Sequence, residues 1–152
     1  MMNTQAIEQA LENGVSRITF SVEDTGDNIR ALSEKTKQTA FVLYQDIPLF
    51  ISDNCVREND CRLCDKKRLE TELMNGKGQY RLISERCQTV VISEQAFAVP
   101  PKERILPAGA YRIDFCYRRY TVNQALSIIE NIKNGRPIPR TNSGNFEKQF
   151  AK

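Results

Sequence analysis

The sequence of 152 residues contains neither histidine nor tryptophan. Without histidine, the chain cannot build a Ser-His or Cys-His triad, or a histidine-ligated catalytic zinc, from its own residues. It also lacks the apolar run of roughly 20 residues that a membrane-spanning helix needs. No Gly-rich phosphate loop and no internal repeat is present. The composition, 40% hydrophobic and 27% charged, is that of a globular protein.

The N-terminal segment, MMNTQAIEQALENG, is polar and carries two glutamates. It has neither the basic start nor the apolar stretch of a secretory signal peptide. We therefore expect a cytoplasmic protein, in which thiols stay reduced, and no membrane partner.

Charge is unevenly distributed along the chain. Residues 1–54 carry four basic residues against eight acidic ones, a net charge of −4. Residues 55–152 carry the other eighteen basic residues against eleven acidic ones, a net charge of +7. A basic half is compatible with a nucleic acid or another anionic partner, but a solvated charged surface is the favoured interpretation.

Hydrophobic patterns in the first third predict alternating helices and strands. The expected elements are a helix from Asn3 or Thr4 to Asn13, a strand over 18–22, a turn over 24–28, a helix over 29–37, a strand over 39–45 and an extended segment over 48–52. This order is typical of βα units with a parallel sheet.

The pattern changes after residue 54. The expected elements are a turn over 74–79, strands over 80–84, 89–93 and 111–117, an irregular stretch over 98–110, a helix opened by a Thr121 capping box and closed by Gly135, and a basic loop over 135–152. Two strand–helix units are too few to close a (β/α)8 barrel, which takes roughly 250 residues. The first 54 residues therefore look like the end of a larger α/β domain, followed by a smaller mixed module.

Three of the five cysteines lie within ten residues, in NCVRENDCRLCDKK. A CxxC pair can place two thiolates on one metal ion or cluster, and the surrounding basic residues favour thiolates. All-sulfur coordination suits Zn²⁺ or an iron–sulfur cluster, and spacing alone barely separates the two. Reduced structural cysteines, a disulfide framework and a redox dithiol are the alternatives.

Several segments together resemble the C-terminal part of the peptidase family U32, the collagenase-like proteases. The matching segments, in chain order, are NGVSRITFSVE, FVLYQDIPLFISDNC, GKGQYRLISERCQTVVIS, LPAGAYRIDF with TVNQALSIIENI, and SGNFEKQF. Gln88 stands where that family usually has arginine in its Cys-Arg-Thr segment.

The resemblance implies an α/β fold, the C-terminal portion of a TIM-barrel-like domain over residues 1–54 and a small mixed α+β cysteine-bearing module over 55–152. Members of the family include peptidases linked to collagen degradation and iron–sulfur proteins required for oxygen-independent hydroxylation of RNA bases or of a quinone precursor. Carried over by position, the ligands of a cluster, [4Fe–4S] with Zn²⁺ as the alternative, are Cys55, Cys61, Cys64 and Cys87. Cys116 is a runner-up ligand or a core thiol.

Glu23 lies where a barrel strand should end, so the resemblance makes it the candidate catalytic carboxylate, for substrate binding or general base catalysis. A solvated or ion-paired glutamate is the alternative. Asp114 shares a strand face with Arg112 and Cys116, which favours a structural ion pair. Arg118 and Arg119, between Tyr117 and Tyr120, could grip RNA or form an exposed turn.

Three functions follow from these observations. The first is an iron–sulfur protein that supports oxygen-independent hydroxylation, with RNA or a partner chain supplying the rest of the barrel as partners and with no DNA partner. The second is a collagenase-like peptidase with structural cysteines. The third is a non-catalytic zinc module.

Overall fold

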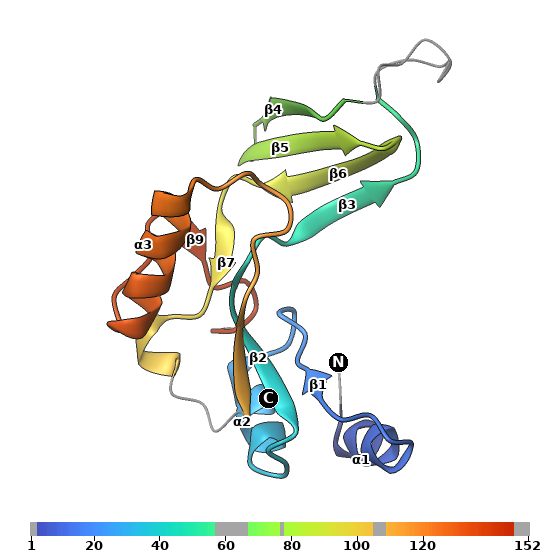
Figure 1. Ribbon diagram of the computed structural model, residues 1–152, viewed down its shortest axis with the longest axis vertical. Coiled ribbons are helices and arrows are strands. Elements are labelled where there is room, and N and C mark those ends of the chain that lie inside the picture. Colours follow the sequence, from blue (N-terminus) through green and yellow to red (C-terminus); the bar gives the residue numbers. More distant parts are fainter. Residues whose placement is uncertain (1–2, 57–66, 77, 105–108, 148–152) are drawn as a thin grey trace. The chain divides into compact units, whose positions relative to one another are not determined.

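The computed structural model describes residues 3–56, 67–76, 78–104 and 109–147. The chain forms two compact units, one of residues 1–45 and 97–152 and one of residues 46–96 (Figure 1). Each unit holds one open sheet, and the described residues contain three α-helices and no closed barrel. A mixed α/β protein is therefore confirmed.

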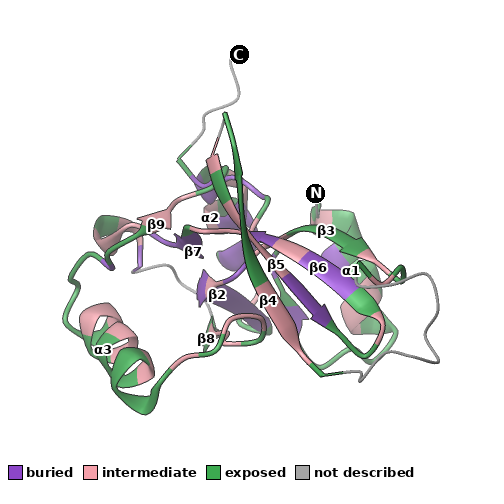
Figure 2. Cartoon of the chain, turned by 90° about the horizontal axis from the view of Figure 1, so that it is seen from above, coloured by how far each residue is buried: buried purple, intermediate pink, exposed green. Residues whose placement is uncertain are grey.

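The discontinuous unit is built around one central strand. Its elements are α1 (Thr4–Glu12), β1 (Ile18–Thr19), α2 (Gly26–Ser33), β2 (Thr39–Gln45), β7 (Ala96–Ala98), η1 (Pro101–Glu103), β8 (Ala110–Ile113), α3 (Val122–Lys133) and β9 (Thr141–Asn142). Strand β2 pairs in parallel with β1 and β8 and antiparallel with β7. Residues 39–44 of β2 are all buried, as expected of a strand covered on both faces (Figure 2). The predicted parallel pairing of 18–22 with 39–45 is confirmed.

Capping residues fix the ends of two helices as the sequence predicts. The side chain of Asn3 accepts a hydrogen bond from the Ala6 amide at 2.8 Å and begins α1. Thr121 and Gln124 form a reciprocal capping box at the start of α3. Beyond α3, Gly135 has a φ of +62°, a left-handed conformation that suits glycine.

Three predicted elements have wrong boundaries. Helix α2 begins at Gly26 instead of Ile29 and ends at Ser33 instead of residue 37. Thr25 caps it, and the Gly26 amide donates to the Phe146 carbonyl at 3.0 Å, so a distant segment starts the helix where local sequence favoured a turn. Strand β1 ends at Thr19, because the chain turns away from β2 after the Phe20 amide bonds to Ala40. Strand β8 likewise ends at Ile113.

The continuous unit is a four-stranded antiparallel sheet. Its strands are β3 (Pro48–Ser52), β4 (Leu69–Asn75), β5 (Gly78–Glu85) and β6 (Gln88–Ser93), in the spatial order β3-β6-β5-β4. The strands at 48–52, 80–84 and 89–93 were predicted, whereas β4 was not. One face buries Ile83, Val90 and Ile92. The predicted domain boundary at residue 54 stays a prediction.

None of the described helices has both the length and the apolar character needed to cross a membrane.

Candidate functional site

Strand order brings Cys55 and Cys87 to the same end of the four-stranded sheet. Ser52, the last residue of β3, pairs with Thr89, which pairs with Ser84, which pairs with Leu69 at the start of β4. The connection that carries the clustered cysteines therefore leaves and re-enters the sheet at this end. The β5–β6 turn that holds Cys87 lies between those two points (Figure 1).

Three contacts hold the segment after β3 across the base of the β5–β6 hairpin. Gln88 Nε2 donates to Asp53 Oδ1 at 3.2 Å, and Thr89 Oγ1 donates to the Asn54 carbonyl at 2.7 Å. The sulfur of Cys55 lies 3.9 Å from Ser84 Oγ. Cys55 is therefore fixed beside the strand residues that lead into the turn.

The buried hydroxyls of Ser84 and Thr89 hold the segment of Asn54 and Cys55 in place. The sequence did not predict this role for either residue. Both side chains are almost completely buried, although they lie at the end of the sheet. Nothing in the local sequence marks them, because their role appears only when β3, β6 and β5 are paired.

Cys87 occupies an unusual backbone position. The two residues between Glu85 and Gln88 are Arg86, with φ of 52°, and Cys87, with φ of 64°. Two positive φ values in a two-residue hairpin loop are the pattern of a type I′ turn, which normally selects Asn-Gly. A non-glycine residue in this conformation carries strain of about 1–3 kcal/mol, and such strain is concentrated at functional sites. The half-buried thiol of Cys87 is a candidate reason for it.

The other two predicted ligands, Cys61 and Cys64, lie outside the described residues. Within the described part of the chain, no three Cys, Asp or Glu side chains are grouped closely enough to hold a metal ion. Cys116 is exposed, and its sulfur donates to Asp114 Oδ1 at 2.6 Å. It belongs to the discontinuous unit.

Charges near the cysteine end are organised as an ion-pair network. Arg68, whose side chain is 12% exposed, contacts Glu70 at 2.7 Å and Glu85 at 3.0 Å. Arg81 contacts Glu94 at 3.1 Å and also Glu70 at 3.5 Å. The positive charge of Arg68, expected to favour cysteine thiolates, is therefore compensated by two carboxylates.

The ion-pair network changes the pKa values of Glu70 and Arg81. Burial alone would raise the pKa of Glu70, but hydrogen bonds and charge attraction from Arg68 and Arg81 outweigh it and lower the pKa. For Arg81, burial works toward a lower pKa, but Glu94 and Glu70 outweigh it and raise the pKa. Glu70 is thus held as a carboxylate that links two arginines.

Glu23 lies beyond the carboxyl end of β1 and is exposed. Its amide donates a hydrogen bond to Ser21 Oγ at 3.2 Å, and its carbonyl accepts a hydrogen bond from Asn145 Nδ2 at 3.3 Å. The neighbouring Asp24 is the buried carboxylate, which sequence reasoning missed. Asp24 accepts hydrogen bonds from the Thr25 amide and from Asn28 Nδ2, so it organises the start of α2.

At the end of β8, Asp114 forms the structural ion pair that its strand face predicted. Arg112 Nη2 lies 2.6 Å from Asp114 Oδ2, and the Asp114 amide donates to the Tyr44 carbonyl at 2.8 Å. The Tyr120 ring packs on Phe115, with centroids 4.7 Å apart, and its hydroxyl lies 3.0 Å from that of Tyr44. Tyr120 is therefore part of an aromatic cluster with Tyr44 and Phe115.

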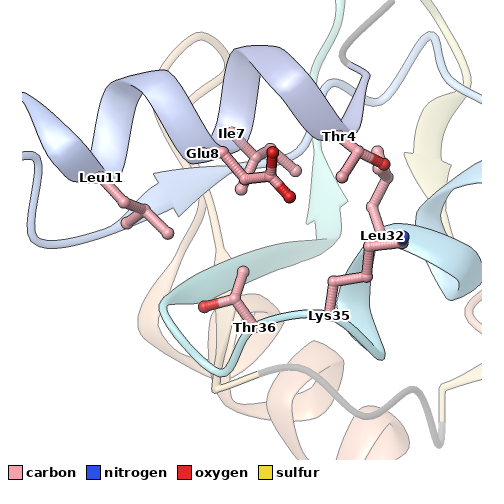
Figure 3. Close-up of a pocket in the computed structure, with 7 residues that line it drawn as sticks. All are labelled: Thr4, Ile7, Glu8, Leu11, Leu32, Lys35 and Thr36. Carbon is pink, nitrogen blue, oxygen red and sulfur yellow. The ribbon is translucent and has the colours of Figure 1, made fainter.

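Pockets lined by described residues include a small one and a larger one. The smaller has a volume of about 80 Å³ between α1 and the end of α2 (Figure 3). Its lining residues are Thr4, Ile7, Glu8, Leu11, Leu32, Lys35 and Thr36. It is far smaller than the 300–1,000 Å³ of ordinary ligand sites. The larger pocket, of about 350 Å³, surrounds Arg104.

No protein-family model, no curated protein and no solved structure matches the chain. The resemblance to peptidase family U32 therefore rests on the motifs quoted above.

Proposed function

We propose that the chain binds an iron–sulfur cluster, [4Fe–4S], through Cys55, Cys61, Cys64 and Cys87, as the C-terminal segment of a peptidase-U32-like protein. The observation that carries the proposal is the placement of Cys55 and Cys87 at one end of the four-stranded sheet. The connection that contains the other two cysteines begins and ends there. Four thiolates are a donor set that iron–sulfur clusters use.

The Arg86–Cys87 turn supports the same proposal. A turn that requires two positive φ values would be more stable with Asn-Gly, yet the chain places a half-buried thiol there. A ligand in a tight two-residue turn is held in one direction, because both flanking strands are paired. Cys55 is fixed by its contact with Ser84 in the same way.

Within this proposal, the bound cluster supplies electrons or activates an oxygen donor for oxygen-independent hydroxylation of an RNA base or a quinone precursor. Glu23, exposed beyond the carboxyl end of β1, is the residue we assign to substrate binding or proton abstraction. We keep the cytoplasm as the compartment, since a cluster of this kind needs reduced thiols.

We also propose that the discontinuous unit represents the last part of a barrel whose remaining strands come from elsewhere. Three parallel strands, β1, β2 and β8, lie side by side as in a barrel wall. No residue of α3 is buried, although Leu126 and Ile129 follow a helical apolar pattern. A partner chain that supplies strands and helices fits this surface. RNA is the alternative partner.

The deciding experiment is anaerobic purification, a visible spectrum, and measurement of iron, zinc and sulfide. Iron and sulfide near four each per chain, with absorption near 400 nm, would support the cluster. One zinc without sulfide would contradict it and favour the zinc module. The absence of both metals would contradict any metal site in this chain.

Matched variants assign the ligands. Cys87→Ser is expected to lose the cluster, whereas Cys116→Ser is expected to keep it, because Cys116 is not in the proposed ligand set. The reverse result would replace Cys87 by Cys116 in the ligand set. Gelatin cleavage by the purified chain, lost in Glu23→Gln, would instead favour the peptidase function.

A further inference from the structure

Arg104 is a buried guanidinium that connects several parts of the discontinuous unit. Only 7% of the residue is exposed. Its Nε donates to the Val99 carbonyl at 2.9 Å, and its Nη1 donates to the carbonyls of Asn131 and Arg136 at 3.2 and 2.8 Å. These bonds use three of the five N–H groups of the side chain. The two N–H groups of Nη2 donate to no residue in the described part of the chain.

Among the described residues, no carboxylate forms an ion pair with Arg104. None of the ion pairs among the described residues includes it, and burial lowers the pKa of the guanidinium without an opposing contribution from an acid. The carbonyls at the end of α3 offer partial negative charge only. A buried charge without a counterion is costly, and native proteins usually pair it.

Arg104 also lines the larger pocket. The pocket has a volume of about 350 Å³. Its apolar walls are Ala98, Val99, Pro100, Pro101, Pro137 and Ile138. Its polar lining, besides Arg104, consists of Thr141, Asn142, Ser143 and Glu147. A pocket of this size, with an apolar wall opposite several polar groups, is large enough for a small molecule, and its prolines restrict the backbone of the wall.

We propose that this pocket binds a small molecule through a carboxylate or phosphate group, with Arg104 Nη2 as the principal donor. Because Nε and Nη1 are already used, the guanidinium offers one nitrogen instead of its usual two-nitrogen fork. One anionic oxygen therefore lies on Nη2, and the remainder of the ligand lies against the proline-rich wall. This site is independent of the proposed cluster, which belongs to the other unit.

Glu147 places a negative charge in the wall of the proposed anion site. Its carboxylate accepts a hydrogen bond from Ser143 Oγ and lines the same pocket. A negative charge in the wall weakens the binding of any anion nearby. Removal of that charge should therefore strengthen binding, which a purely structural role of Arg104 would not predict.

The test uses the full chain labelled with ¹⁵N and follows the arginine Nε–H signals by NMR. Arg104 is assigned by the signal that disappears in Arg104→Lys. Sodium acetate and sodium phosphate are titrated as separate probes, and sodium chloride at equal ionic strength is the control. We expect a saturable shift of the Arg104 signal and of the Thr141 and Asn142 amides, with dissociation constants of about 1–10 mM, ordinary for probes of four or five heavy atoms.

A shift that does not saturate, or that chloride reproduces, would overturn the proposal. The Thr141 and Asn142 amides of the wild-type chain give this answer even if Arg104→Lys does not fold. Saturation by acetate alone or by phosphate alone supports the site and identifies the group. Glu147→Gln should tighten binding about two- to threefold, and Arg17→Gln, a change at an exposed arginine, should leave it unaltered. Weaker or unchanged binding in Glu147→Gln would contradict an anion at this wall.

Discussion

Replacing Cys87 by glycine and by alanine separates backbone strain from thiol chemistry at the β5–β6 turn. Both substitutions remove the same thiol, and they differ in how well they accept a φ of 64°. The left-handed conformation costs a non-glycine residue about 1–2 kcal/mol. The greater freedom of glycine in the unfolded chain offsets about 0.4–1 kcal/mol of this. We therefore expect metal-free Cys87→Gly to be about 1 kcal/mol more stable than Cys87→Ala.

The measurement is urea unfolding of the reduced, metal-free protein, followed by circular dichroism. A difference of 1 kcal/mol would also appear as a shift of about 2–4 °C in the melting temperature of a chain of this length. Equal stability, or greater stability of the alanine variant, would refute the strained turn. Arg86→Asn is the companion variant, because asparagine tolerates a φ of 52° and the thiol remains.

The same variants connect strain with function. If the thiol of Cys87 is a cluster ligand, Cys87→Gly and Cys87→Ala both lose iron, whereas Arg86→Asn keeps it and gains stability. A Cys87→Gly protein with its full iron content would remove Cys87 from the ligand set.

Two further predictions concern single contacts. Gly26→Ala should lower the unfolding free energy by about 1–3 kcal/mol, because an added Cβ would lie 2.9 Å from the buried ring of Phe146 and 3.1 Å from its carbonyl oxygen. The control is Gly76→Ala, whose added Cβ would meet nothing within 4 Å. Equal losses of stability in the two urea titrations would contradict the clash at Gly26. The pKa of Glu70 is lowered from 4.5, so its ion pairs stabilise the fold above that pH and this contribution is lost as the pH falls below it. Glu70→Gln should therefore lose less stability than wild type between pH 6 and pH 3, and identical pH profiles would show that the ion pairs contribute nothing.

Elements with strong local signals could be predicted from the sequence. Strand β2 is a continuous apolar run, and α1 and α3 carry side-chain caps at their first residues. Strand β4 was missed because glutamates alternate with its apolar residues. In the structure, Glu70 and Glu72 of this strand face Arg81 on β5, so cross-strand ion pairs support a segment of low β-propensity.

The candidate sites, like β4, depend on contacts that the local sequence does not reveal. The cysteine spacing suggested a shared ligand set, but only the strand order places Cys55 beside the hairpin that carries Cys87. Arg104 carried no signal at all, since a single arginine in a proline-rich stretch is unremarkable in sequence. Its role depends on carbonyls that lie 27 and 32 residues further along the chain.

The unit of residues 46–96 is inserted into the sequence of the discontinuous unit. Residues 46–96 leave the discontinuous unit after Gln45 and return at Phe97, and these two residues are paired across β2 and β7. The two ends of the inserted segment are therefore as close as the ends of a hairpin. A short turn could join them, so the sheet with Cys55 and Cys87 could be removed, expressed alone or transplanted into another hairpin. During synthesis this segment can form as soon as it emerges, whereas the surrounding unit must wait for Phe146 to reach Gly26.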